Sequence, residues 1–236
     1  MKTIGLIGGM SWESTALYYR EINELVKQRL GGLHSARVLL YSVDFAEIES
    51  LQHAGEWEKT ASILAAAARS LESGGADFFL ICTNTMHKVA KPVQEAVNIP
   101  LLHIADATAQ ALKEQGISRV GLLGTRFTME QDFYKGRLQQ QFGIDVLVPD
   151  IGGRDTIHRV IYDELCLGQI NESSRQAYLA IVNQLQEQGA EAVILGCTEI
   201  GMLIGDCASG VPFFDTTAIH ASRAVDRALG ETGSNN

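Results

Sequence analysis

The chain has 236 residues, of which 46% are hydrophobic and 20% are charged, a composition typical of a globular protein with an ordinary core. A net charge of −9 argues against nucleic acid or an anionic membrane as a partner, because both attract cationic proteins. No apolar run approaches the roughly 20 residues of a membrane-spanning helix, and the four cysteines lack the Cys-x-x-Cys spacing of structural zinc sites. We therefore expect a cytoplasmic protein with reduced thiols and no metal.

The first half of the chain alternates short apolar runs with segments of helical periodicity. Strands are expected at residues 3–7, 38–43, 78–82 and 100–104. Helices are expected at residues 14–30, 57–71, 89–96 and 107–114, and glycine pairs end the first two of them.

The second half follows the same alternation. Strands are expected at residues 120–123, 146–148, 192–195 and 211–214, and helices at residues 129–142, 157–167, 173–188 and 219–229. The Gly-Ser-Asn-Asn tail at 233–236 is expected to be disordered. Unbroken apolar strands that alternate with helices predict parallel sheets covered on both faces.

The two halves also resemble each other in sequence. Residues 75–85 and 189–199 both run Gly-Ala-acid, then apolar residues, then a small nucleophilic residue, so that Thr83 and Cys197 correspond at a separation of 114. Residues 4–8 correspond to 120–124, and 99–102 to 211–214. We predict an α/β fold of two similar, flavodoxin-like lobes with parallel-sheet cores and the active site in the cleft between them. The first lobe is 1–103 plus 216–236, and the second is 104–215.

Cys197 is the leading candidate for chemistry. It follows Gly196 at a strand end, where ligands of parallel-sheet proteins bind. A thiol there meets backbone N–H groups at the start of a helix, which favours the thiolate. Free cysteines are more often small buried hydrophobes, which is our interpretation of Cys82 and Cys166, whereas Cys207 has the sequence surroundings of a loop thiol.

Other polar residues near strand ends are weaker candidates. Thr83 on its own is typical of a helix cap, and the repeat is what pairs it with Cys197. His87 lies one turn further on and either orients a site group or lies at the surface. Arg126 either binds a carboxylate or is a solvated charge. Gly5, Gly8 and Gly9 do not have the spacing of a dinucleotide-binding loop, and we interpret them as allowing a ligand close to the backbone.

In combination, Gly8-Gly9-Met10, Thr83-Asn84-Thr85 and Gly196-Cys197-Thr198-Glu199 resemble the aspartate/glutamate racemases. The resemblance covers essentially the whole chain and is nearest to the L-aspartate/glutamate-specific, broad-specificity amino-acid racemases. It implies an isomerase that inverts an amino-acid Cα without pyridoxal phosphate or another cofactor. Cys197 would then act on the L-enantiomer and Thr83 on the opposite face. The substrate would be bound by Met10, Gln52, Asn84, Thr85, Thr198 and Glu199. Arg126 is added as a candidate contact because of its position after Thr125 and not because of the resemblance.

The chain departs from the family pattern in two respects. The first thiol of the two-thiol pattern is replaced by Thr83, and the Arg and Lys that bind the distal carboxylate are absent from 44–49 and 161–166. A tolerant distal pocket is therefore expected, and a homodimer is considered. The single thiol keeps two alternatives open: a decarboxylase or isomerase of malonate- or maleate-type acids, and a small-molecule sensor that has lost catalysis.

Overall fold

The structure is a computed structural model that describes residues 1–205 and 207–230. The described residues divide into two compact units. Unit 1 is Met1–Ile104 together with the chain from His220 onward, and unit 2 is Ala105–Ile219. The tail that was expected to be disordered lies outside the described residues.

The sheet of unit 1 is parallel and has the order β2-β1-β3, with β1 at Ile4–Gly8, β2 at Val38–Ser42 and β3 at Phe78–Ile81. The predicted strand at 100–104 is wrong, because this segment forms an isolated bridge between Leu101 and Phe79. Pro100 has no N–H to donate to a ladder, and helix α5 already begins at Ile104.

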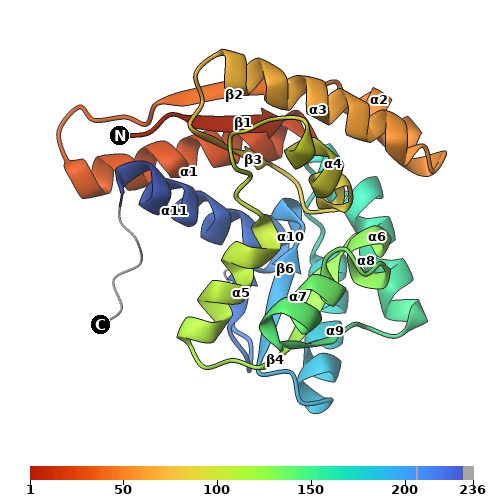
Figure 1. Cartoon of the computed structure of the whole chain (residues 1–236). Coiled ribbons are helices and arrows are strands. Elements are labelled where there is room, and N and C mark those ends of the chain that lie inside the picture. The colour runs from red at the N-terminus through yellow and green to blue at the C-terminus, as the bar shows by residue number, and fades with distance from the viewer. Residues whose placement is uncertain (206, 231–236) are drawn as a thin grey trace. The chain divides into compact units, whose positions relative to one another are not determined.

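Helices cover both faces of the unit 1 sheet (Figure 1). Alternate strand residues such as Leu6 and Leu80 pack against α1 and α11, which lie side by side and are joined by an ion pair of 2.5 Å between Arg29 and Asp226. The other set, which includes Ile81, packs against α2, α3 and α4. The helical elements are α1 (Trp12–Leu30), α2 (Phe45–His53), α3 (Trp57–Ser73), the 3₁₀ helix η1 (Thr85–Val89), α4 (Ala90–Glu95) and α11 (Thr216–Leu229).

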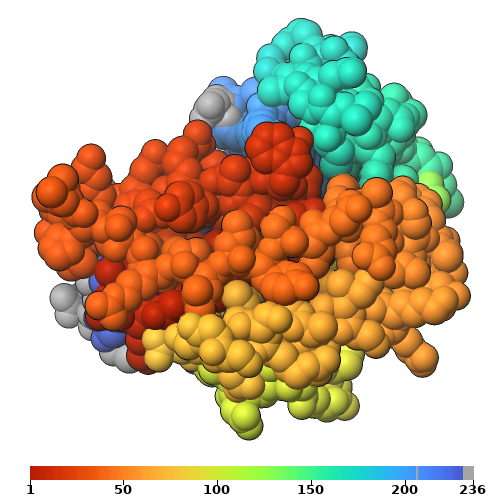
Figure 2. Space-filling view, turned by 90° about the horizontal axis from the view of Figure 1, so that it is seen from above, coloured from red at the N-terminus to blue at the C-terminus, as the bar shows by residue number. Residues whose placement is uncertain are grey.

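The edge strand of unit 1 is partly open to solvent. In β2, Leu40 and Tyr41 expose 49% and 39% of their surface. The orange surface in Figure 2 includes this part of the chain together with α2 and α3. An edge strand with exposed apolar side chains is a surface on which another chain can pair.

Unit 2 repeats the topology of unit 1. Its sheet is parallel with the order β5-β4-β6-β7, so that β5, β4 and β6 correspond to β2, β1 and β3. The α/β fold with two parallel-sheet cores is therefore confirmed. The strands are β4 (Arg119–Gly124), β5 (Asp145–Leu147), β6 (Ala192–Gly196) and β7 (Phe213–Asp215), and the helices are α5 (Ile104–Glu114), α6 (Arg126–Glu130), α7 (Lys135–Phe142), α8 (Ile151–Asp163), η2 (Leu165–Leu167), α9 (Glu172–Glu187) and α10 (Thr198–Ile204).

Tertiary packing changes two of the predicted helices of unit 2. The predicted helix at 129–142 is divided, because Gln131 is extended (ψ 153°) and Tyr134 is buried with its hydroxyl 3.4 Å from Thr108 Oγ1. The predicted helix at 157–167 begins earlier, at Ile151, because the Asp150 side chain caps it by accepting from the Gly153 N–H at 2.7 Å.

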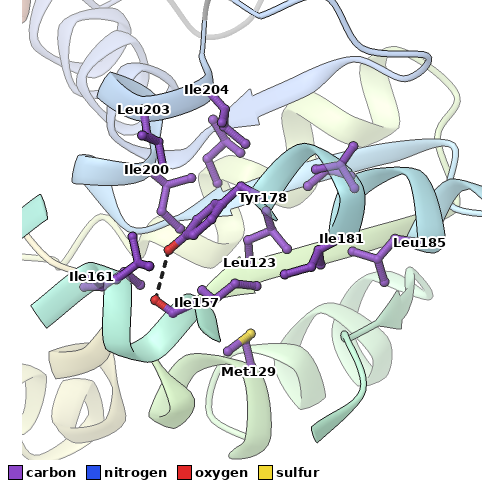
Figure 3. Packing of buried hydrophobic residues seen from close by; sticks show 14 of the residues in the cluster. Leu123, Met129, Ile157, Ile161, Tyr178, Ile181, Leu185, Ile200, Leu203 and Ile204 are labelled. Atoms are coloured by element: carbon purple, nitrogen blue, oxygen red, sulfur yellow. Dashed lines mark hydrogen bonds between the residues drawn. The ribbon is translucent and has the colours of Figure 1, made fainter. Parts of the chain in front are cut away.

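A continuous apolar cluster fixes the end of β6 in unit 2 (Figure 3). It joins Leu123 and Leu195 of the sheet to α8, α9 and α10. Within it, the Tyr178 hydroxyl donates to the Ile157 carbonyl at 2.9 Å, so that a buried polar atom is satisfied inside the cluster. Cys197, between β6 and α10, is partly buried against this cluster. The segment that carries the thiol is thus held in place because both β6 before it and α10 after it pack in this cluster.

Candidate active site

In unit 1, the chain turns directly after β3 and presents Thr83. Cys82 points back into the core between the sheet and the α1–α11 face, where burial raises the pKa of its thiol, as expected for a structural cysteine. Thr83 is one residue further on and is partly exposed, whereas Asn84 and Thr85 are buried. The 3₁₀ helix η1 then begins at Thr85. Thr83 therefore lies in a short turn after β3, and the residues that follow it in this turn are buried.

The structure brings two other predicted contacts close to this turn. Gln52 of α2 is buried, and its Nε2 atom lies 3.0 Å from Met86 Sδ. Met86 directly follows Thr85, and Met10 belongs to the same apolar cluster. Met10, Gln52 and Thr85 therefore belong to one region of unit 1, although they are far apart in sequence.

Gly8, the last residue of β1, and Gly9 are needed for a reason that differs from the expected one. A Cβ at Gly8 would lie 2.3 Å from Thr15 Cγ2, and a Cβ at Gly9 would lie 2.2 Å from the Val43 carbonyl oxygen. Gly9 also has a positive φ of 89°, and its N–H donates to Thr15 Oγ1 at 2.8 Å. These glycines allow the chain to approach itself, which corrects the interpretation that they make room for a ligand.

In unit 2, Cys197 occupies the position between β6 and α10 that the sequence predicted. Its thiol donates to Glu199 Oε2 at 2.9 Å. Burial and the nearby Glu199 carboxylate raise the pKa of Cys197 well above its ordinary value. The expectation of a thiolate is therefore wrong for the resting protein, because the helix start is outweighed by burial and a neighbouring negative charge. The raised pKa and the contact with Glu199 favour a thiol that donates to this side chain.

Hydroxyl contacts tie the Cys197 segment to the end of β7. Thr198 Oγ1 lies 2.9 Å from Thr217 Oγ1, and Thr216 Oγ1 donates to the Leu195 carbonyl at 2.9 Å. The Asp215 carboxylate accepts from the Thr217 N–H at 2.8 Å, and burial raises its pKa. Thr217 was not among the predicted site residues, although it lies in a polar run at a strand end.

Arg126 is exposed and already has an anionic partner. Its Nη2 atom lies 2.6 Å from Asp155 Oδ1, and its backbone N–H donates to His158 Nδ1 at 3.2 Å. The charge of this side chain is therefore offset within unit 2, which makes it a weaker carboxylate contact than its sequence position suggested.

Within residues 1–205 and 207–230, no three His, Cys, Asp or Glu side chains are grouped as metal ligands would be. No helix in the described part of the chain has the length and hydrophobicity needed to cross a membrane. All four cysteines lie in that part and are free thiols.

A family model for Asp/Glu/Hydantoin racemase matches residues 7–224. The chain belongs to this family. It is 23% identical, over 238 aligned positions, to the broad-specificity amino-acid racemase RacX of Bacillus subtilis (strain 168), and the alignment covers 96% of this chain and 98% of that protein.

Solved structures agree with this assignment. A candidate Asp/Glu racemase from Yersinia pestis is 58% identical, with a TM-score of 0.92 over 97% of this chain and 100% of that chain. An aspartate racemase homologue from Pyrococcus horikoshii OT3, PH1733, is 34% identical, with a TM-score of 0.85 and the same coverage. The resemblance inferred from the strand-end motifs is therefore confirmed, and the protein is an amino-acid racemase and thus an isomerase.

Proposed function

We propose that this racemase acts on aspartate, glutamate and a wider set of amino acids, without pyridoxal phosphate or another cofactor. The broad specificity named for RacX supports the range, and the aspartate racemase homologue supports acidic substrates. The absence of the family's Arg and Lys from 44–49 and 161–166 supports a tolerant distal pocket, because no dedicated cation from these segments selects a second carboxylate. Among the predicted contacts, buried Gln52 is then a better candidate for the distal group than exposed Arg126.

The observation that carries the proposal is the contact between the Cys197 thiol and the Glu199 carboxylate. In the proposed mechanism, the thiol proton moves to Glu199, and the thiolate that remains removes the Cα proton of the L-enantiomer. After these two proton transfers Glu199 is protonated and neutral, Cys197 is again a thiol, and the negative charge lies on the substrate carbanion. General bases of this kind contribute about 10² to 10⁴ to a rate.

Thr83 serves the opposite face of Cα in this proposal. Its hydroxyl delivers a proton to the carbanion, and water reprotonates the resulting alkoxide. The hydroxide that remains is neutralised by the proton held on Glu199, which restores the resting carboxylate. A hydroxyl is not ionised at neutral pH, so this side is slower than the Cys197 side. The abstracted proton on Cys197 exchanges with solvent, and Cys197 can protonate the same face of Cα many times before an inversion is completed. L-side exchange with solvent should therefore outrun racemisation.

The test is incubation of the enzyme in D₂O with the L- and D-forms of aspartate, glutamate and homoserine. NMR measures the loss of the Cα–H signal, and chiral chromatography measures inversion. We expect deuterium in the L-enantiomer before the D-enantiomer accumulates. Ligand binding without any Cα exchange would favour the sensor alternative, and release of CO₂ from a malonate would favour the decarboxylase.

Two further parts of the proposal concern the setting of the reaction. A cytoplasmic location is proposed because catalysis by a thiol requires reduced cysteine. A homodimer is proposed to form along the edge strand β2, where Leu40 and Tyr41 are exposed. Sedimentation of the wild type and of Tyr41→Lys tests the second point, since a charge at this edge should favour the monomer.

A further inference from the structure

Three histidines are buried close together in unit 1, and one of them, His87, contacts the Thr83 turn. His87 exposes 2% of its surface, His103 exposes 8%, and His220 is fully buried. The ring centroid of His87 lies 4.5 Å from that of His103 and 6.0 Å from that of His220. Histidine is intermediate in its tendency to be buried, and a buried imidazole still has two polar nitrogen atoms. Their nitrogen atoms therefore need defined partners.

His87 holds the turn through both its backbone and its ring. Its backbone N–H donates to the Asn84 carbonyl at 3.1 Å, and its Nδ1 atom lies 2.8 Å from the Thr83 carbonyl oxygen. The Ile104 N–H points at Nε2 from 3.2 Å. One side chain thus joins the turn after β3 to the first residue of α5.

These partners determine where the ring proton of His87 lies. The Ile104 N–H can only donate, so Nε2 must accept and carries no proton. In a neutral ring the proton is then on Nδ1, where it can be donated to the Thr83 carbonyl.

The contacts of His220 determine the position of its ring proton in the same way, and they place it on the other nitrogen, Nε2. Its Nε2 atom lies 2.9 Å from the Leu102 carbonyl, which can only accept, and its Nδ1 atom lies 2.9 Å from the Tyr18 hydroxyl. His220 is therefore a donor at Nε2 and an acceptor at Nδ1. Burial, together with the nearby His87, lowers the pKa of His220 to about 3, which keeps this ring neutral.

We infer that His87 is a positioning residue for Thr83: its Nδ1–H holds the Thr83 carbonyl and thereby fixes the turn that presents the hydroxyl to Cα. The inference rests on the proposed function, in which Thr83 serves one face of the substrate and Cys197 the other. A side chain that orients Thr83 should influence protonation on the Thr83 face and leave exchange on the Cys197 face in place.

Two substitutions at one position separate the two ring contacts. In His87→Asn, the amide nitrogen replaces Nδ1, so the donor to the Thr83 carbonyl is kept and the acceptor for Ile104 is lost. In His87→Gln, the longer amide reaches the Nε2 position, so the Ile104 contact is kept and the donor to Thr83 is lost. His103→Gln is the matched control, because it removes a ring packed against His87 at 4.5 Å.

The measurement is the ratio of L-to-D inversion to L-side deuterium exchange, with aspartate in D₂O. We expect this ratio to fall at least about tenfold in His87→Gln, since small losses of alignment are costly, and to stay within about threefold of wild type in His87→Asn and His103→Gln. An unchanged ratio in His87→Gln, or equal loss of inversion and exchange, would overturn the inference. Absence of exchange in the wild type would overturn the proposed function instead.

A second measurement needs neither a variant nor a substrate. Long-range ¹H–¹⁵N correlation spectra of the wild-type protein distinguish the two neutral forms of a histidine ring. We expect the proton on Nδ1 in His87 and on Nε2 in His220. A His87 ring protonated on Nε2 could not accept from Ile104 or donate to Thr83, and the inference would be wrong even if every variant folded poorly.

Discussion

The turn after β3 in unit 1 and the turn after β6 in unit 2 occupy the same place in a repeated topology, yet they carry side chains of different acidity. Thr83 corresponds to Cys197 at a separation of 114, and Thr85 corresponds in the same way to Glu199. Unit 1 thus has hydroxyl side chains at both positions, Thr83 and Thr85. Unit 2 has a thiol and a carboxylate at the corresponding positions. The Cys197–Glu199 contact of 2.9 Å gives unit 2 a group that can take a proton.

The residues that pack near the two turns also differ in charge and size between the units. His87 corresponds to Gly201, and, at the separation of 112 that relates the following segments, His103 corresponds to Asp215. Unit 1 packs two imidazoles against each other, whereas in unit 2 a Cβ at Gly201 would lie 2.5 Å from Asp215 Oδ2. The duplication has kept the strand order and the strand-end position. It has placed imidazole rings next to the Thr83 turn and a carboxylate in contact with Cys197, a difference that supports the proposal that Cys197 removes the proton.

The largest effect is expected from removal of the thiol. Cys197→Ser should reduce L-side Cα–H exchange by about 10³-fold, because a serine hydroxyl is not a base at neutral pH. The control is Cys166→Ala, since Cys166 packs at the border of the apolar cluster and should be dispensable. NMR in D₂O measures both. Near-normal L-side exchange in Cys197→Ser would mean that the Cys197 thiol is not the base, and the proposed difference in function between the two turns would be wrong.

The next effect concerns Glu199. Glu199→Gln keeps a hydrogen-bond acceptor but removes the charge that raises the pKa of Cys197. Alkylation by iodoacetamide should therefore reach its half-maximal rate at a lower pH, while L-side exchange should slow by about 10²-fold because the proton acceptor is gone.

Glu191→Gln is the control for Glu199, because Glu191 lies just before the opposite end of β6 and accepts from the Ser118 and Arg119 N–H groups. It should change neither rate by more than about twofold. If Glu199→Gln accelerated alkylation and exchange together, the Glu199 charge would act only by disfavouring the Cys197 thiolate, and Glu199 would not be the proton acceptor.

A third experiment makes the two turns more alike. Thr83→Cys restores a thiol on the first side and should raise D-side exchange and net racemisation together, by about tenfold, because a thiol ionises far more readily than a hydroxyl. Deuterium uptake and optical rotation, followed for both enantiomers, give the two rates. Equally fast exchange of both enantiomers in the wild type would mean that Thr83 is already an effective base, and the asymmetry would have to be abandoned.

The sequence predicted the repeated α/β fold because apolar runs alternate with helical segments in both halves. It predicted the Cys197 position because Gly196 and the following polar residues mark a strand end. It did not predict α2, which begins where the Asp44 side chain accepts from the Ala46 N–H at 3.1 Å, because a single cap is a weak local signal. The raised pKa of Cys197 was also missed, since burial depends on residues distant in sequence. For the same reason, nothing local indicates the contact between Tyr18 and His220, which are 202 positions apart.

The histidine cluster of unit 1 should make that unit sensitive to acid. The pKa of His220 is about 3 in the folded chain and near 6.5 when the side chain is free. The unfolded chain therefore binds a proton that the folded chain excludes. The free energy of unfolding should fall as the pH decreases from about 6.5 toward 3, by up to about 1.4 kcal/mol per pH unit.

Both tryptophans, Trp12 and Trp57, belong to unit 1, so their fluorescence during urea unfolding at pH 7, 6 and 5 reports on this unit. His220→Gln should be less stable at pH 7 but should lose this component of the pH slope. His34→Gln is the control, because it removes an exposed histidine that lies outside the buried cluster. An identical slope in His220→Gln would mean that other groups cause the acid sensitivity.

The smallest effect is expected at Arg126, whose guanidinium is held by Asp155 at 2.6 Å and is half-exposed. An exposed, paired charge contributes little, so Arg126→Ala should change KM for aspartate by less than about threefold. Asp155→Ala is the sharper variant, because it releases the guanidinium. If Arg126 faces the distal carboxylate, Asp155→Ala should lower KM for aspartate and glutamate but not for homoserine. A loss of tenfold or more in Arg126→Ala, confined to the acidic substrates, would return Arg126 to the role that its sequence position first suggested and would give unit 2 a part in substrate selection as well as in proton abstraction.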